Sequence, residues 1–264
     1  MEIKDFTLKS FKNLLVILQN KNYRFVSFAD FLSDQSNLNN PQSSIIILRH
    51  DIDLKKQSSL NFARLEHELG IKGTYYFRAV RKIFDPEIIK TIADLGHEIG
   101  YHYEDLSACR GDFEKAIMSF ERNLNKFRSV VPVQTISMHG NSLSKFDNKK
   151  LWDKYNYRDY GLIGEPYFDL DFKQVLYLTD SAQRWNGSKI AVRDKVQSGF
   201  DFDFTTTFDI IDNIDSLPPK IMITVHPDRW TDNPLEWHRI NAVVKIKNFI
   251  KVNFLSKRAE VITR

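Results

Sequence analysis

The stretch that decides the fold is SIIILRHDID, residues 44–53. It begins with a continuous run of β-branched and apolar residues, which is typical of a strand buried on both faces of a parallel sheet. An arginine, a histidine and two aspartates follow within residues 49–53. The stretch therefore predicts a central strand whose carboxyl end brings Asp51 and Asp53 to one place.

Strands and helices alternate along the rest of the chain. Apolar and β-branched runs predict strands at 74–77, 98–102, 135–138 and 221–225, with short strands near 175–178 and 202–206. Amphipathic spacing and end signals predict helices at 8–20, 56–69, 86–96, 112–127, 147–155 and 235–254. Such alternation indicates βαβ units and a parallel sheet. In a (β/α) barrel and in an open doubly wound sheet alike, ligands bind beyond the carboxyl ends of the strands.

Composition and charge narrow the class of protein. A hydrophobic fraction of 42% in 264 residues supports a substantial core and argues against disorder. The net charge of +4 comes from interspersed charges without a dense Lys/Arg stripe, so we expect no nucleic-acid partner. The N-terminus lacks a signal-peptide pattern, no run approaches the ~18 apolar residues of a membrane span, and there is one cysteine, Cys109. These features favour a cytoplasmic protein without a membrane span.

Chemically capable side chains stand where the predicted strands end. A cation beside Asp51 and Asp53 would keep one ionised as a ligand and leave the other as a base; the alternative is a polar loop whose aspartate caps the next helix. Three histidines end further strands: His102 in GHEIGYH, His139 in SMHGN and His226 in ITVHPDRW. Each histidine alone is more often structural than catalytic. We interpret His97, at the beginning of its strand, as a buried hydrogen-bonding residue.

The order of these motifs resembles the polysaccharide deacetylases, carbohydrate esterase family 4. That family begins with a strand ending in an aspartate pair and continues with an apolar strand like GTYYF at 73–77. The family motif Gly-His-Glu-Ile-Gly-x-His follows, and residues 96–102 reproduce it. An Asp and Trp motif is resembled by Asp180 and Trp185, and a final strand ending in histidine by His226.

The resemblance implies a distorted (β/α) barrel with about seven strands and an α/β architecture. Because the sequence contains no internal repeat and no clear linker, we expect a single domain over residues 1–264, with residues 1–44 as an N-terminal helical extension packed on the barrel. The resemblance also implies a divalent metal, usually zinc, held by one aspartate and two histidines. By position it assigns Asp51 as general base, Asp53 as metal ligand, His102 as first histidine ligand and His226 as general acid.

Two departures concern the second histidine ligand. In the family this ligand follows the first by four residues, but that position is Leu106 here. The family's Arg-Pro-Pro-like motif is replaced by Ser-Met-His-Gly at 137–140. We hypothesise that His139 supplies the missing ligand, and Glu104 or Asp105 are the alternatives.

These residues predict metal-dependent hydrolysis of an N-acyl group, acetyl or formyl, on a sugar. The expected substrate contacts are Arg78, Tyr103, Asn141, Asp180 and Trp185. Arg49 and Arg78 have two possible roles. They orient Asp51 or bind substrate, or they form structural ion pairs. Because we expect a cytoplasmic protein, we favour a nucleotide-linked or lipid-linked sugar of surface-polysaccharide synthesis as the substrate.

Two other functions stay open at this point. One is a catalytically inert carbohydrate-binding relative on the same fold, which Leu106 favours. The other is an iron oxygenase with two histidines and one carboxylate, because Asp53, His102 and His139 have the right ligand types.

Overall fold

The computed structural model describes residues 4–34, 43–141, 144–186 and 195–250. Its centre is β2 (Ile45–Ile52), the strand that residues 44–53 predicted. The other strands are β1 (Arg24–Val26), β3 (Thr74–Phe77), β4 (Glu98–Tyr103), β5 (Ile136–Met138), β6 (Leu176–Thr179) and β7 (Lys220–Val225). All seven form one parallel sheet in the order β5-β4-β3-β2-β7-β6, with β1 beside the first half of β2. The predicted distorted barrel of about seven strands is confirmed, and among the described residues β5 and β6 leave it open between them.

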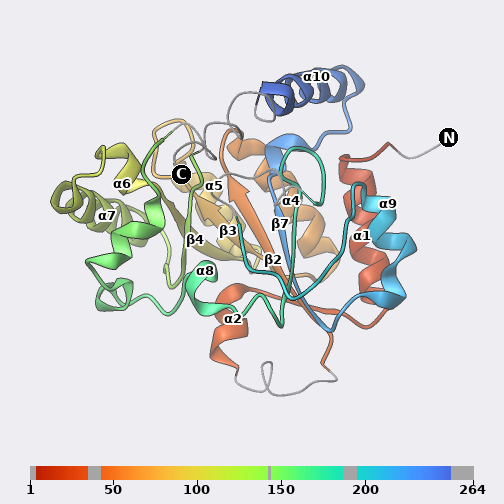
Figure 1. The fold of residues 1–264 in the computed structure, drawn as a ribbon, viewed down its shortest axis with the longest axis horizontal. Coiled ribbons are helices and arrows are strands. Elements are labelled where there is room, and N and C mark those ends of the chain that lie inside the picture. Colours follow the sequence, from red (N-terminus) through yellow and green to blue (C-terminus); the bar gives the residue numbers. More distant parts are fainter. Residues whose placement is uncertain (1–3, 35–42, 142–143, 187–194, 251–264) are drawn as a thin grey trace, which may run out of the picture.

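Helices surround this sheet (Figure 1). They are α1 (Leu8–Asn20), α2 (Phe28–Ser33), α4 (Lys56–Glu68), α5 (Pro86–Asp94), α6 (Asp105–Ala108), α7 (Phe113–Arg128), α8 (Pro166–Asp169), α9 (Thr207–Asp212) and α10 (Pro234–Ile250). Short 3-10 helices are η1 (Asn148–Asp153), η2 (Tyr157–Tyr160), η4 (Ile214–Ser216) and η5 (Pro227–Arg229). The sequence fixes several helix starts, because Thr7, Asp85 and Asp112 accept hydrogen bonds from the first-turn N–H groups of α1, α5 and α7. The helix predicted at 147–155 is the shorter η1, and the end of the one predicted at 235–254 lies outside the described residues.

Side chains of β2 alternate between two environments, as the pleat of a strand requires. Ile46 and Leu48 pack outward in the main core with residues of α1, α4, α5 and α7. Ile45 and Ile47 face the inside of the barrel in a second cluster. Asp51 continues the inward series, so the same alternation that fills the barrel's lower half with apolar groups presents carboxylates at its upper end.

The described residues of the segment 1–44 include a strand in addition to the expected helices. They also contribute β1 to the sheet, where Arg24 pairs with Ile45. Phe28 and Phe31 of α2 are buried in the inner cluster and fill the barrel's amino-terminal end. The described part of this region therefore belongs to the barrel itself.

The strand expected at 202–206 is absent from the structure. Phe202 and Phe204 alternate with polar residues like a half-buried strand, but their rings stack on one another at 5.1 Å between centroids in an irregular segment. Phe204 is buried, and no strand of the described residues pairs with this segment. The alternation reflects aromatic packing instead of sheet pairing.

Gly100 is required where β3 and β4 approach each other below the site. A Cβ at this position would lie 2.3 Å from the ring of Tyr76 and 3.0 Å from the carbonyl oxygen of Thr135. Glycine therefore lets the Tyr76 ring occupy the barrel interior under Arg49.

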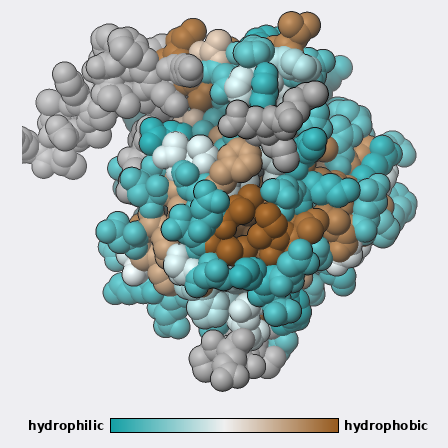
Figure 2. Space-filling model, turned by 90° about the vertical axis from the view of Figure 1, so that its right-hand side faces the viewer, coloured by the Kyte–Doolittle hydropathy of each residue, from teal (hydrophilic) through white to brown (hydrophobic). Residues whose placement is uncertain are grey.

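The outer surface is mainly hydrophilic on the side of α1 and α9, with one hydrophobic area near its centre (Figure 2). Among the described residues, no helix has both the length and the apolar character needed to cross a membrane.

Candidate active site

An arginine–aspartate pair lies on the inner face of β2. Arg49 donates two hydrogen bonds to Asp51, from Nε to Oδ1 at 2.8 Å and from a terminal nitrogen to Oδ2 at 2.7 Å. Both residues are buried, with 1% and 4% of their surface exposed, and the guanidinium lies over the rings of Tyr76 and Tyr167. Burial raises the pKa of Asp51, but Arg49, His102 and His226 outweigh it and hold this pKa well below the usual range. Asp51 is therefore ionised at neutral pH, and Arg49 orients it.

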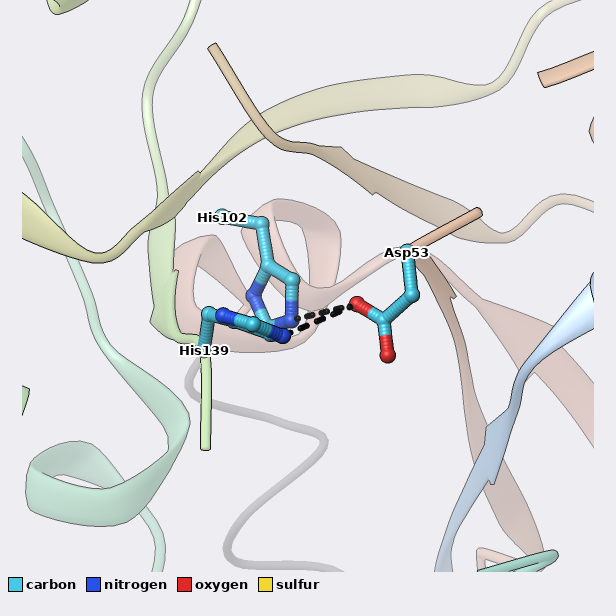
Figure 3. Close-up of side chains that lie close together, drawn as sticks. All are labelled: Asp53, His102 and His139. Carbon is cyan, nitrogen blue, oxygen red and sulfur yellow. Dashed lines mark ion pairs between the residues drawn. The ribbon is translucent and has the colours of Figure 1, made fainter. Parts of the chain in front are cut away.

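Asp53, His102 and His139 converge at the carboxyl ends of β2, β4 and β5 (Figure 3). Asp53 Oδ1 lies 3.6 Å from His102 Nε2 and 3.5 Å from His139 Nε2, and the three candidate ligand atoms all lie within 4.8 Å of one another. Two ligand atoms of a tetrahedral zinc ion are about 3.4 Å apart, given bonds of roughly 2.0–2.2 Å. Asp53 Oδ1 is also buried without a hydrogen-bond partner among the described residues. These residues therefore fit a divalent metal ion.

The second ring nitrogen of each histidine is held by another group. His102 Nδ1 lies 2.9 Å from the carbonyl oxygen of Ser137, and His139 Nδ1 lies 2.9 Å from Glu104 Oε2. Glu104 is fixed in turn by Arg78 at 2.7 Å. Such partners orient the imidazoles so that Nε2 faces the site. Burial lowers the pKa of His102 to about 4, so its ring is neutral at neutral pH, which is the form that binds a metal.

His226 stands across the site, directly after β7. Its Nδ1 lies 2.5 Å from Asp180 Oδ1, and its Nε2 lies 4.0 Å from Asp51 Oδ2 and 3.9 Å from Asp53 Oδ2. Asp180 also accepts hydrogen bonds from the backbone N–H of His226 and the indole N–H of Trp230. Burial and Arg229 lower the pKa of His226, but Asp180 and Asp53 raise it more, so it lies above the usual value. This histidine is therefore held in one orientation with a tendency to carry a proton at Nε2.

Three expected substrate contacts are corrected by their burial. Tyr103, Asp180 and Trp185 expose 1% of their surface or less. Tyr103 alternates with His102 on β4 and so points out of the barrel, and the Trp185 indole donates to Thr207. Asp180 contacts His226, Arg229 and Trp230 and does not line the cavity beside the site. Arg78 and Asn141 remain predictions.

Residues 104–106, where the resemblance would place the second histidine ligand, offer no other ligand to the site. Leu106 is buried in the outer core, and Asp105 binds Tyr101, Ser119 and Asn123, away from the site. Glu104 contacts the far nitrogen of His139. His139 is thus the residue that geometry places where a third ligand is needed.

Other histidines lie outside this group. His97 contacts Glu66 and bridges the backbone of Gly73 and Ala63, as a buried structural histidine does. His50 faces outward on β2 and lies 2.7 Å from Glu66.

Glu165 was not anticipated from the sequence. It is buried, accepts the N–H of Met138 at 3.0 Å, and interacts electrostatically with Arg49. Burial raises its pKa to about 7. Only the following Pro166, typical of a helix start, marks this position in the sequence.

A cavity of about 430 Å³ adjoins the site. Asp53, Arg78 and His139 line one side, and Arg239 and Val243 of α10 line another. Since these groups border both the candidate ligands and open solvent, the cavity is the natural place for a substrate.

Known proteins similar to this chain are found among solved structures. Neither a family model nor a characterised protein matches the chain by sequence. The chain is similar to a Streptococcus mutans CE4 esterase, with 12% identity, a TM-score of 0.45, and 88% of this chain and 90% of that chain covered. It is also similar to a family 4 carbohydrate esterase from Streptomyces lividans in complex with acetate, with 16% identity, a TM-score of 0.40, and coverage of 76% and 85%.

A third similar structure is a CE4 family pseudoenzyme from Bacillus anthracis, with 12% identity and a TM-score of 0.44. The match covers 79% of this chain and 63% of that chain, so it spans less than two thirds of the pseudoenzyme's length. All three likenesses lie below 25% identity and have TM-scores below 0.5, so none of them assigns this chain a family or an activity.

Proposed function

We propose that this protein is a metal-dependent hydrolase that removes an N-acyl group, acetyl or formyl, from a sugar. One observation carries the proposal: Asp53, His102 and His139 converge on one point, with the Asp51 carboxylate and the His226 imidazole beside it. A metal centre flanked by one base and one acid can catalyse amide hydrolysis.

Asp53, His102 and His139 would hold the metal, for which zinc is the proposed identity because a set of one carboxylate and two imidazoles suits it. When bound, such an ion supplies Lewis acidity, which polarises an acyl carbonyl and lowers the pKa of a water molecule. The neutral ring of His102 and the ionised carboxylate of Asp53 are the states that ligands need.

Asp51 is the proposed general base. Its carboxylate is ionised and held at both oxygens by Arg49, so it can orient an attacking water and accept the proton as the water adds to the carbonyl. A carboxylate stabilised in this way is a weak base, so it accepts the proton only from water that has already become acidic.

His226 is the proposed general acid. Nδ1 is directed at Asp180, which leaves Nε2 facing Asp51 and Asp53. Its raised pKa keeps a proton available at Nε2 near neutral pH. That proton would pass to the amine as the C–N bond breaks.

The substrate is proposed to be a small acylated sugar, nucleotide-linked or lipid-linked, used in surface-polysaccharide synthesis in the cytoplasm. The cavity of about 430 Å³ beside the ligands has the size of a sugar-binding site. Arg78, which lines this cavity, and Asn141 are the proposed substrate contacts.

The test is release of acetate or formate from a panel of N-acylated sugars by zinc-loaded protein. Asp51→Asn should keep the metal and lower turnover by about 10²–10⁴-fold, which is the usual loss when a general base is removed. Asp94→Asn is the matched control, because Asp94 is an exposed aspartate paired with Lys90 far from the barrel mouth. Full activity of Asp51→Asn would refute the base assignment. Sugar binding without release of any acid would instead support an inert relative, the function that Leu106 favours.

A further inference from the structure

We propose that the cavity beside the candidate metal centre binds a phosphate group carried by the acylated sugar, through Arg239 and Lys55. This inference rests on the proposed function, because it names the class of substrate for the same site. Its starting point is the charge of the cavity wall. Four cationic side chains, Lys55, Arg78, Arg229 and Arg239, face two carboxylates, Asp53 and Asp228.

The four cationic side chains differ in the hydrogen bonds and ion pairs that they already form. Arg78 forms a hydrogen-bonded pair with Glu104, and Arg229 contacts Asp180. Arg239 is exposed and forms no hydrogen bond or ion pair among the described residues. Its guanidinium therefore retains five N–H donors in a planar fork, which is the geometry that phosphate oxygens accept best.

Lys55 also lines the cavity, and it is paired with the helix that carries Arg239. The Lys55 ammonium pairs with Glu236 in the first turn of α10, three residues before Arg239. The same turn is held at the N-terminal segment, because the Trp237 indole donates to the carbonyl oxygen of Asp5 at 2.8 Å. An ammonium has three donors, so Lys55 can bind a phosphate oxygen while it keeps its partner. The start of α10 is thus fixed where Arg239 reaches the cavity.

The two carboxylates of the wall do not cancel this attraction. Asp53 lies on the metal-centre side of the cavity, where His139 Nε2 and His226 Nε2 lie 3.5 and 3.9 Å from its carboxylate oxygens. Asp228 follows His226 by two residues and interacts electrostatically with Arg229. On the α10 side, Glu236 pairs with Lys55 and interacts electrostatically with Arg239, so these two cations keep one positive charge in excess. A phosphate there would leave the acyl group free to reach the metal centre.

An apolar strip borders the cationic side. Leu54 and Val243 line the cavity with 49% and 45% of their surface exposed. A phosphate that carries a prenyl chain could place the chain on this strip, and a nucleoside diphosphate could place its base there. Both sources share the phosphate ester that Arg239 and Lys55 would recognise.

The test is binding to metal-free protein, measured by titration calorimetry, so that neither turnover nor a metal–phosphate contact contributes. The probes are N-acetylglucosamine, N-acetylglucosamine 1-phosphate, uridine diphosphate and farnesyl phosphate. We expect at least one phosphate probe to bind about tenfold or more tightly than the neutral sugar, because each charge-assisted hydrogen bond changes Kd by about tenfold. Arg239→Gln should remove most of this preference, and raising the salt concentration should weaken binding to wild type more than to the variant.

The matched control is Arg64→Gln, which replaces an exposed arginine of α4 that also lacks a hydrogen bond among the described residues. It should leave binding unchanged. Equal affinity for neutral and phosphorylated probes, no binding of any phosphate probe, or equal losses in Arg239→Gln and Arg64→Gln would each overturn the proposal. A Val243→Ser variant identifies the source: weaker binding of farnesyl phosphate alone supports a lipid-linked sugar, and an effect on uridine diphosphate alone supports a nucleotide-linked one.

Failure of this inference can be told apart from failure of the proposed function. Release of acetate from a neutral sugar, without any phosphate preference, would keep the hydrolase and overturn the phosphate site. Tight phosphate binding that depends on Arg239, without acid release from any substrate, would keep the phosphate site and contradict the hydrolase.

Discussion

Replacing Arg49 by methionine should destabilise the fold strongly, because the buried carboxylate of Asp51 then loses the two hydrogen bonds that its partner donates. The two side chains expose 1% and 4% of their surface and share two hydrogen bonds of 2.7 and 2.8 Å. Removing one partner of a buried pair costs about 3–5 kcal/mol of the free energy of unfolding. The assay is urea unfolding of metal-free protein at pH 7, followed by circular dichroism.

The pH dependence of this effect has a definite sign. The native pKa of Asp51 lies below that of an unfolded aspartate, so the pair stabilises the fold fully above about pH 4, the unfolded value, and this contribution is lost as the pH falls through the native pKa. The gap between wild type and Arg49→Met should therefore be full at pH 7 and narrow toward pH 3.

Two controls make this prediction specific to the pair. Arg49→Met combined with Asp51→Leu should recover part of the loss, because no charge is then left unpaired. Arg64→Met, at an exposed position, should change the free energy of unfolding by less than about 0.5 kcal/mol. A loss below about 1 kcal/mol for Arg49→Met, or a double variant less stable than the single one, would refute the reasoning.

Three further perturbations test other parts of the site. Asp180→Asn should lower the pKa of His226, so the basic limb of a kcat/KM profile should move to lower pH; an unchanged limb would contradict the pairing seen at 2.5 Å. Glu104→Gln should weaken zinc affinity about 10–100-fold, measured with a competing chelator, because it removes the carboxylate that orients His139; unchanged affinity would contradict this role. The pKa of Glu165 is raised to about 7 in the folded protein. Its contribution to the free energy of unfolding is therefore full below about pH 4.5, the unfolded value, and falls by ~3 kcal/mol as the pH rises through 7. Glu165→Gln should flatten this fall in stability in urea unfolding between pH 5 and 8, and an identical slope in wild type and variant would contradict the assignment.

The central strands could be predicted from the sequence because a buried strand has an almost entirely apolar composition. A strand covered on both faces must be apolar throughout, as in residues 45–48 and 221–225, and both predictions are confirmed. β1 was missed because three residues, Arg24 to Val26, carry too short a pattern to indicate a strand. Its place in the sheet depends on pairing with Ile45, which no local pattern reveals.

Site residues at the ends of strands could be predicted from the sequence. Pairs of residues far apart in the sequence could not. Asp53, His102 and His139 each follow or end a strand of the same sheet, so parallel pairing alone brings them together. Tyr103 could have been excluded as a substrate contact from the sequence, because the residue after an inward-facing His102 must point outward. The pairing of Asp180 with His226, 46 residues apart, depends on the register of β6 and β7 and could not have been derived locally.

The measurement that tests the account most directly is the metal content of purified protein, by elemental analysis, for wild type and for Asp53→Ala, His102→Ala and His139→Ala. His67→Ala is the matched control, because His67 is an exposed histidine of α4 outside the site. We predict nearly one equivalent of zinc or a similar divalent ion in wild type and in His67→Ala, and its loss in each of the other three variants. Wild-type protein without metal even after zinc is added, or metal retained in His139→Ala, would contradict the proposed centre.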